Sequence, residues 1–429
     1  MSSSLIVSGK KQPKGEIQIS GAKNSATRLL AAATITDEKV LLKNFPTKLV
    51  DANYKKRFIN ENGGSVKFDD QNNTAEIIAK DYSANDLNDY DFPIRTTYLL
   101  ATGMLKREGF ARIPYPGGCK IGSRGYDLHI HVWEQAGCKV EEKQDFLEIT
   151  CDKLKPFEIN FPISTIGGTE NALITASCIP GESIIRNAYV SPEVEDLIGF
   201  LRSLGSEIEL SGNSFIRIKG LSNPRGATYT VMPDRIEALT WMVLAAISDG
   251  DLLIKDVPFD SMEIPLTHLK EAGVDIFRNS KNAIVNQHSI KEDHIQPFEV
   301  ACGTHPGVIS DMQPFYVLLA LKADGVSRIY DYRYPERMQY LEELSKFCPG
   351  AIEWEKGAIT VRGPVKFTGA ESTSTDLRGS MALVMAALIA NGESKINKVE
   401  MALRGYNDLE AKLMNIGYSM NVTKEVLAV

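Results

Sequence analysis

A short loop at residues 116–124 holds the side chains best suited to chemistry. It reads Pro-Gly-Gly-Cys-Lys-Ile-Gly-Ser-Arg and so places one thiol, Cys119, among three glycines, Lys120 and Arg124. Glycines let a backbone turn tightly and present its N–H groups to an anion. Cations lower the pKa of a neighbouring thiol, and the thiolate is the reactive form. The loop predicts a reactive cysteine beside an anion site; the alternative for this segment by itself is a basic surface turn with an inert cysteine.

The composition of the chain narrows the class of protein. Its 429 residues, 43% apolar and 24% charged, are typical of a soluble globular protein with two domains. The formal net charge of −7 argues against nucleic acid as the main partner, although a local basic site can still hold a phosphorylated small molecule. No run approaches the roughly 20 apolar residues of a membrane span, and the first residues lack the pattern of a signal peptide, so we expect a cytoplasmic protein. Six cysteines without CxxC spacing indicate neither a zinc site nor a disulfide framework.

The elements that must position such a loop are six internal repeats. Each repeat has a polar or basic start followed by an Ala/Leu-rich helix, at intervals of about 65 to 75 residues. The apolar parts of these helices are expected at residues 29–33, 98–101, 172–176, 243–246, 317–320 and 383–387. Because they are apolar nearly all round, we expect them to be buried.

A second, amphipathic helix follows each of the six, and it ends in a glycine turn and a β-rich run. These runs begin near residues 63, 137, 205, 273, 350 and 417. Each repeat therefore predicts the order strand, helix, strand, helix, strand pair, with the second helix on the outside.

Charged and polar residues stand at the starts of the predicted buried helices. They are Lys23 and Asn24, Arg95, Thr169 and Asn171, Asp234 and Arg235, Asp311, and Arg378. A helix N-terminus offers free N–H groups and a positive dipole end, which favour anions. Capping explains the Asp and Thr residues, but not the cations, which oppose the dipole. The pattern favours an anion-binding cavity where these ends converge.

Several motifs occur in the order found in the enolpyruvyl transferases, and the chain resembles that family over essentially its whole length. They are Gly-Ala-Lys-Asn at 21–24, the cysteine loop, Pro-Asp-Arg-Ile-Glu at 233–237, Asp-Met-Gln at 311–313, Asp-Leu-Arg at 376–378 and Arg-Gly-Tyr at 404–406. The resemblance implies a two-domain inside-out α/β barrel, in which each domain has three βαβαββ-type repeats around buried inner helices. The first domain is expected at 21–232 with the cysteine loop at 114–125, and the second at 1–20 plus 233–429. Hinges are expected near Ser20 and Met232, with the substrate cleft between the domains.

The activity implied by the resemblance needs no metal or cofactor. It is transfer of the enolpyruvyl group of phosphoenolpyruvate to the 3-hydroxyl of UDP-N-acetylglucosamine with release of phosphate, the first committed step of peptidoglycan synthesis. Asp311 is implied as the general base and Cys119 as the general acid or covalent participant, with Lys23 and Arg404 completing the catalytic set. The residues implied to hold phosphoenolpyruvate are Lys23, Arg95, Arg124, Arg378 and Arg404. Those implied to hold the nucleotide sugar are Asn24, Arg124, Tyr126, Asp127, Leu128, Thr165, Ile166, Gly167 and Asp311.

Departures from the family pattern lie in the nucleotide region. Arg124 is followed by Gly125 where the family usually has proline, and residues 162–165 lack the lysine expected near the diphosphate. These differences leave open the same transfer to another uridine nucleotide, such as uridine monophosphate in a specialised pathway. A third alternative is a non-catalytic paralogue that binds a nucleotide or a partner. The sequence leaves the oligomeric state open.

Overall fold

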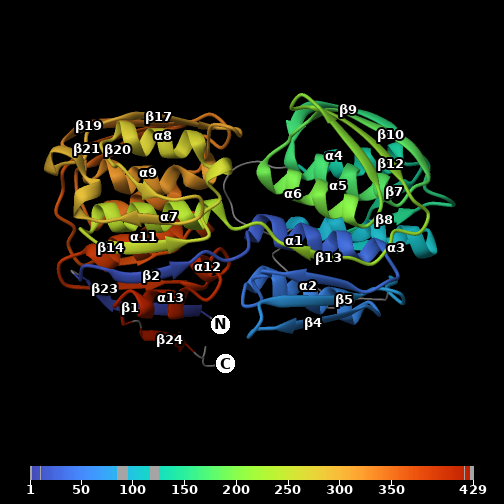
Figure 1. The fold of residues 1–429 in the computed structure, drawn as a ribbon, viewed down its shortest axis with the longest axis horizontal. Helices are drawn as coiled ribbons and strands as arrows, with labels where there is room; N and C mark the ends of the chain where they lie inside the picture. Colours follow the sequence, from blue (N-terminus) through green and yellow to red (C-terminus); the bar gives the residue numbers. More distant parts are fainter. Residues whose placement is uncertain (1, 10, 85–94, 116–124, 420, 426–429) are drawn as a thin grey trace. The chain divides into compact units, whose positions relative to one another are not determined.

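The computed structural model describes residues 2–9, 11–84, 95–115, 125–419 and 421–425, and it shows a mixed α/β protein (Figure 1). The chain divides into two compact units, with the divisions between Ser20 and Gly21 and between Met232 and Pro233. We call the described residues within 21–84, 95–115 and 125–232 the first unit, and those within 2–20 and 233–425 the second unit. No helix among the described residues is long and apolar enough to cross a membrane.

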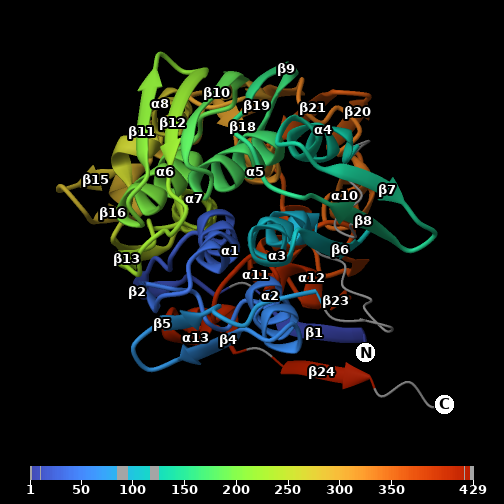
Figure 2. The same cartoon turned by 90° about the vertical axis from the view of Figure 1, so that its right-hand side faces the viewer.

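The first unit carries three sheets among its described residues, in the orders β13-β3-β5-β4, β6-β8-β7 and β11-β12-β10-β9. Its helices are α1 (Lys23–Ala32), η1 (Ala33–Ile35), α2 (Val50–Glu61), η2 (Arg95–Leu100), α3 (Ala101–Glu108), α4 (Asp127–Gln135), α5 (Ile166–Ser177) and α6 (Pro192–Ser203). Its strands are β3 (Val40–Lys43), β4 (Ser65–Asp69), β5 (Thr74–Ile78), β6 (Phe110–Pro114), β7 (Lys139–Glu142), β8 (Phe146–Thr150), β9 (Glu158–Thr165), β10 (Gly181–Ala188), β11 (Glu207–Ser211), β12 (Phe215–Gly220) and β13 (Thr228–Thr230). In Figure 2 the helices α1, α3 and α5 lie inside this unit, and the 3-10 helix η2 contacts both α1 and α5.

The described part of the second unit also has three sheets, in the orders β22-β23-β1-β24, β15-β16-β14-β2 and β18-β17-β19-β21-β20. Its helices are α7 (Arg235–Ile247), η3 (Phe259–Ser261), α8 (Glu263–Glu271), η4 (Gln287–Ser289), η5 (Lys291–Asp293), η6 (Ser310–Met312), α9 (Gln313–Ala320), α10 (Gln339–Ser345), α11 (Leu377–Ile389), α12 (Glu400–Leu403) and α13 (Leu409–Asn415). Its strands are β1 (Ser2–Ser8), β2 (Lys14–Gln18), β14 (Asp251–Lys255), β15 (Phe277–Arg278), β16 (Ala283–Val285), β17 (Glu299–Gly303), β18 (Val308–Ile309), β19 (Gly325–Asp331), β20 (Ile352–Glu355), β21 (Ala358–Gly363), β22 (Glu371–Thr373), β23 (Glu393–Asn397) and β24 (Asn421–Glu425).

The N-terminal strands belong to the second unit, although they are distant from it in sequence. β1 lies between β23 and β24 and pairs antiparallel with both, while β2 pairs parallel with β14. Leu5 and Val7 of β1 are buried in the core of this unit. The first twenty residues therefore complete sheets that are otherwise built from the C-terminal half of the chain.

Helices occupy all six apolar segments singled out in the sequence. Every residue of α7 is buried, as expected for a helix that is apolar nearly all round. Two of the six begin in 3-10 geometry, at η2 and at η6, so their first turns are tighter than the periodicity predicts. Helix α6 shows the contrasting amphipathic pattern, because it buries Val194, Leu197 and Leu201 on one face.

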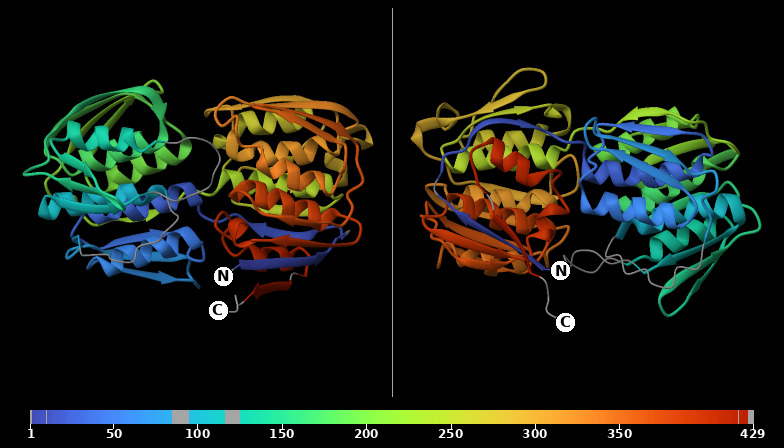
Figure 3. Two further views of the ribbon diagram at one scale, coloured as in Figure 1. Left: turned by 180° about the vertical axis from the view of Figure 1, so that it is seen from behind. Right: turned by 90° about the horizontal axis from the view of Figure 1, so that it is seen from below.

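Inside the second unit, α9 packs against α7 and α11, and the strands lie around these helices (Figures 1 and 3). Each unit has its own continuous apolar core. Helices α9 and α11 thus pack directly against each other. This packing positions the charged residues described next.

Candidate active site

Asp311 lies in the turn η6 between two buried arginines. Arg337 donates through Nη1 to Asp311 Oδ1 at 2.8 Å, and Arg378 Nε lies 3.4 Å from Asp311 Oδ2. The Asp311 side chain is 28% exposed, whereas the side chains of Arg337 and Arg378 are 2% and 1% exposed. The arrangement fixes one carboxylate at the edge of solvent between two cations.

Asp376 is a second buried carboxylate beside these arginines, and it pairs with the guanidinium of Arg337. It is the N-cap of α11, where its Oδ1 accepts from the backbone N–H groups of Arg378 and Gly379, both at 3.1 Å, and it also accepts from Arg337 Nη2 at 2.7 Å. Two arginines and two aspartates then form a cluster with no net charge. Without these partners the desolvation of two buried cations would cost several kcal/mol each, on the order of the whole stability of a domain.

The Arg404 segment packs onto the same cluster. Arg378 donates through Nη1 to the carbonyl of Gly405 at 3.4 Å, and its guanidinium lies 5.2 Å from the centre of the Tyr406 ring. A Cβ at Gly405 would meet Leu377 Cδ2 at 2.3 Å, so a larger residue there would require the Leu377 side chain to move. Burial raises the pKa of Tyr406 to about 12, so its hydroxyl stays protonated beside Thr240. The structure thus brings Asp311, Arg378 and the two residues that follow the buried Arg404 to one place in the second unit.

Lys23 and Asn24 begin α1 in the first unit, at a second group of charges. Lys23 Nζ lies 3.3 Å from Asp51 Oδ2, so the cation that opposes the helix dipole is paired with a carboxylate from α2. One turn later, Arg28 donates through Nε to Glu170 of α5 at 2.9 Å.

Lys55 is a fully buried neighbour of these charges. It donates through Nζ to the carbonyl of Thr27 at 2.5 Å. Burial, followed by repulsion from Arg28, lowers the pKa of Lys55 well below its usual range. Lys55 and Asp51 both lie on α2, which the sequence patterns treated only as an outer covering helix.

The two segments expected to hold the nucleotide lie together in the first unit. Tyr126 to Leu128 stand at the start of α4, and Thr165 to Gly167 at the start of α5. A Cβ on Gly167 would come within 2.9 Å of His129 Nε2, and Asn171 Nδ2 donates to the His129 carbonyl at 3.4 Å. Thr165 Oγ1 accepts from Gly168 N–H at 3.3 Å, so its hydroxyl caps the helix and the α5 start follows ordinary capping.

Tyr126 is held by the β7–β8 hairpin. Its hydroxyl donates to Glu142 Oε2 at 2.7 Å, and this hydrogen bond raises the pKa of Tyr126 to about 12. Its ring lies 5.4 Å from that of Tyr115. Asp127 is exposed and Leu128 is half-buried.

Cys119 and Arg124 lie outside the described residues, and of Arg95 only the backbone at the start of η2 is described. The other five cysteines are all buried. Burial raises the pKa of Cys178 and of Cys348 to about 12, so these thiols are poor nucleophiles at neutral pH.

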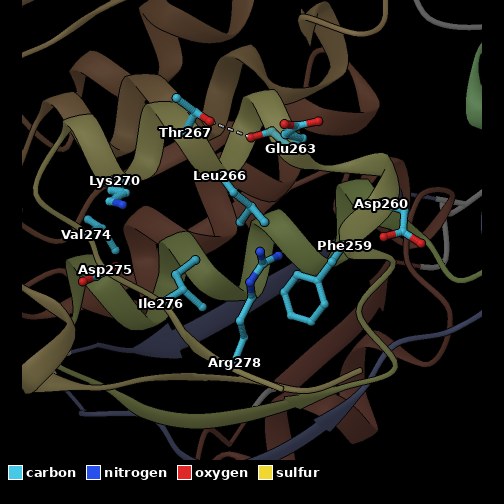
Figure 4. Close-up of a pocket in the computed structure, with 10 residues that line it drawn as sticks. All are labelled: Phe259, Asp260, Glu263, Leu266, Thr267, Lys270, Val274, Asp275, Ile276 and Arg278. Carbon is cyan, nitrogen blue, oxygen red and sulfur yellow. Dashed lines mark hydrogen bonds between the residues drawn. The ribbon is translucent and has the colours of Figure 1, made fainter. Parts of the chain in front are cut away.

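A surface pocket of about 370 Å³ lies elsewhere in the second unit, beside α8 (Figure 4). Its lining residues are Phe259, Asp260, Glu263, Leu266, Thr267, Lys270, Val274, Asp275, Ile276 and Arg278. It contains none of the site residues indicated by the sequence, so its size alone does not make it the active site.

Arg337, Asp376 and Asp51 are residues that the sequence reasoning did not assign to the site. Arg337 starts no repeat helix, and it lies in the connection between β19 and α10. Asp376 was seen within the Asp-Leu-Arg motif, and its N-cap position gives a local signal. Arg337 and Asp51 carry no comparable local signal.

Comparison with known proteins gives the class of protein to which this fold and these clusters belong. Residues 7–413 match the family described as EPSP synthase (3-phosphoshikimate 1-carboxyvinyltransferase). The chain is 36% identical over 410 residues to UDP-N-acetylglucosamine 1-carboxyvinyltransferase 1 of Carboxydothermus hydrogenoformans, covering 94% of each chain. It is 34% identical over 429 residues to UDP-N-acetylglucosamine 1-carboxyvinyltransferase 2 of Listeria monocytogenes, covering 100% of this chain and 99% of the relative.

Solved structures agree in fold. The crystal structure of the enolpyruvyl transferase NikO from Streptomyces tendae is similar with a TM-score of 0.85 and 22% identity, covering 98% of this chain and 99% of that one. EPSP synthase from Acinetobacter baumannii is similar with a TM-score of 0.72 and 17% identity, covering 99% of this chain and 100% of that one. The chain belongs to the enolpyruvyl (1-carboxyvinyl) transferase family, and it is a transferase.

Proposed function

We propose that the protein transfers the enolpyruvyl group of phosphoenolpyruvate to the 3-hydroxyl of UDP-N-acetylglucosamine and releases phosphate. The observation that carries this proposal is the partly exposed Asp311 carboxylate held between the buried Arg337 and Arg378. It places a proton acceptor, held in direction by two fixed cations, at the edge of solvent, and relatives at 34% and 36% identity carry the name of this activity. As the finer architecture we propose three βαβαββ-type repeats around inner helices in each of the domains 21–232 and 1–20 plus 233–429.

The proposed reaction has two halves. The acceptor hydroxyl forms a bond to C2 of phosphoenolpyruvate while it loses its proton to Asp311, and C3 gains a proton from Cys119. The bond from C2 to the phosphate oxygen then breaks, C3 returns a proton to the Cys119 thiolate, and Asp311 passes its proton to the departing phosphate, which leaves an enol ether, free phosphate and the starting enzyme. Lys23, Arg95, Arg124, Arg378 and Arg404 hold the phosphate and carboxylate, where cations stabilise the charge that develops on the leaving group.

Arg337 and Arg378 determine how the Asp311 carboxylate can act on the acceptor hydroxyl. Two nearby cations fix the direction of the carboxylate through their hydrogen bonds to it. In the proposed reaction Asp311 acts as a general base: it orients the acceptor hydroxyl and accepts its proton as the new bond forms. We expect correct orientation of the hydroxyl to account for most of its contribution to the rate.

The nucleotide region supports a second candidate, transfer to another uridine nucleotide such as uridine monophosphate. Residues 162–165 provide no cation, and Ile163 there is 58% exposed. A charged hydrogen bond to a phosphate contributes about 1.5 to 3 kcal/mol, so its loss weakens a diphosphate-containing acceptor. Phosphate release measured with phosphoenolpyruvate and a panel of uridine nucleotides, with the product mass determined, separates the two. Absence of turnover with every acceptor would point to the non-catalytic paralogue instead.

Ile163→Lys tests the acceptor further. If the acceptor is UDP-N-acetylglucosamine, the new cation should tighten its binding about tenfold or more, since 1.4 kcal/mol corresponds to tenfold. Thr165 is unsuitable for this test, because its hydroxyl caps α5 and its loss would cost about 1 kcal/mol. Ile284→Lys, at an exposed isoleucine of the second unit, is the matched control for added charge. Tighter binding of uridine monophosphate alone would favour the second candidate.

Cys119 is expected to be the cysteine that an electrophilic phosphoenolpyruvate mimic such as fosfomycin labels. The reason is its glycine-rich, cationic sequence setting, in contrast to the five buried thiols. Peptide mass spectrometry after partial labelling should find the adduct at Cys119. Equal labelling at Cys138 or Cys302 would contradict the assignment.

A further inference from the structure

Asp331 is a buried carboxylate that the proposed reaction does not use, and its side chain is hydrogen-bonded to the segment that contains Asp311. Asp331 ends strand β19 and is 1% exposed. Its backbone is fixed by the sheet, because it is registered against Cys302 of β17 and its N–H bonds to Gly357. Because the sheet fixes the backbone of Asp331, the residues that are hydrogen-bonded to its side chain are also held in place.

The Asp331 side chain holds both ends of the segment that contains Asp311. Ser310 Oγ donates to Asp331 Oδ1 at 2.7 Å, and Gln313 Nε2 donates to Asp331 Oδ2 at 3.2 Å. Ser310 and Gln313 are themselves buried and enclose Asp311 in the sequence. The backbone N–H groups of Arg333 and Tyr334 also donate to Oδ1, at 3.0 and 2.8 Å.

These donors are all neutral groups, and they fix the orientation of the Gln313 amide. Tyr340 donates from its hydroxyl to Gln313 Oε1 at 2.8 Å, so the amide nitrogen must face Asp331. A buried carboxylate costs desolvation energy that an apolar residue would avoid. A fully satisfied polar network at this place instead specifies one arrangement of the turn.

We propose that Asp331 is a positioning residue for Asp311, acting through Ser310 and Gln313. The inference rests on the proposed function, in which Asp311 accepts the proton of the acceptor hydroxyl. Arg337 also holds this turn, since it donates to the Ser310 carbonyl at 3.0 Å and to Asp311. Asp331 thus keeps the carboxylate in the direction that the reaction needs.

Asp331→Asn gives a specific mismatch. Three donors meet at Oδ1, so the oxygen of the new amide must stay there and its nitrogen must face Gln313 Nε2, donor against donor. A misplacement of about 1 Å can cost about 100-fold in rate. We expect kcat to fall about 10- to 100-fold while the Kd of the acceptor, measured by titration, changes less than about threefold.

A paired substitution separates positioning from a merely structural role. Asp331→Asn combined with Gln313→Glu places an acceptor opposite the new amide nitrogen, and the second new carboxylate oxygen can still accept from Tyr340. We expect the pair to recover at least about tenfold of the lost kcat. Asp69→Asn is the matched control, because Asp69 also accepts two backbone N–H groups but in an exposed turn of the first unit.

Two results would overturn the inference: kcat per folded molecule unchanged in Asp331→Asn, or no recovery in the pair. If Asp331→Asn does not fold, Ser310→Ala tests the same contact by removing one donor, and it should lower kcat about 2- to 10-fold; no loss there overturns the inference. Asp311→Asn measured in parallel keeps the two proposals apart. Normal turnover of Asp311→Asn would refute the base assignment, whereas its loss together with a normal Asp331→Asn would refute only the positioning role.

Discussion

Asp311→Asn is expected to lower kcat about 10²- to 10⁴-fold, the range that a general base contributes. The substitution keeps the shape of the side chain and removes its ability to accept a proton. It also leaves Arg337 and Arg378 with one carboxylate fewer, which raises the positive charge of the cluster by one. Binding of phosphoenolpyruvate should therefore be unchanged or tighter, and binding of the acceptor should stay within about tenfold.

The decisive test of Asp311 compares the effect of Asp311→Asn on substrate Kd with its effect on the rate of chemistry. Titration of each substrate gives the two Kd values, and single-turnover phosphate release gives the rate of chemistry. Asp260→Asn, an exposed aspartate of the same unit, controls for the loss of one negative charge. Near-normal single-turnover rates in Asp311→Asn would remove Asp311 from the role of base, and a large loss of acceptor binding would make it a binding residue instead.

The sequence indicates which site residues stand at helix starts, but it does not indicate which side chains pair with them. Asp311 and Arg378 could be singled out because each stands where an apolar helix begins, a position with a recognisable local pattern. That Arg378 meets Asp311 follows from the packing of α11 against α9, which is a tertiary contact between residues 67 positions apart. The local periodicity of the sequence cannot predict such a pairing.

The cations at helix starts show the same limit. Because cations oppose the helix dipole, the sequence pattern predicts Lys23 and Arg378 to line an anion-binding cavity. The structure gives each a carboxylate partner, Asp51 for Lys23 and Asp311 for Arg378. Burying a cation requires such a partner, but the partner's position in the chain depends on which helices pack together. Anion binding by Lys23 and Arg378 therefore remains a proposal, because each cation already has a carboxylate partner. These ion pairs also allow the cations to be buried.

Arg337→Met is expected to lower the free energy of unfolding of the second unit by about 3 to 5 kcal/mol. The substitution fills similar volume but leaves Asp376, 1% exposed, without its guanidinium partner, and breaking one side of a buried ion pair typically costs this much. Asp311 and the Ser310 carbonyl lose a donor at the same time. Turnover should fall as well, at least about tenfold, because the carboxylate is no longer fixed in direction.

Two variants locate the origin of the Arg337 effect. Arg328→Met, at an exposed arginine of β19 that pairs with Glu299, should cost less than about 1 kcal/mol, since exposed ion pairs contribute little. Adding Asp376→Asn to Arg337→Met should restore part of the loss, because it removes the unpaired buried charge while the amide oxygen still caps α11. Denaturant unfolding followed at equilibrium measures all three. If Arg337→Met costs no more than Arg328→Met, the cluster of Arg337, Arg378, Asp311 and Asp376 does not stabilise the unit in the way its geometry indicates.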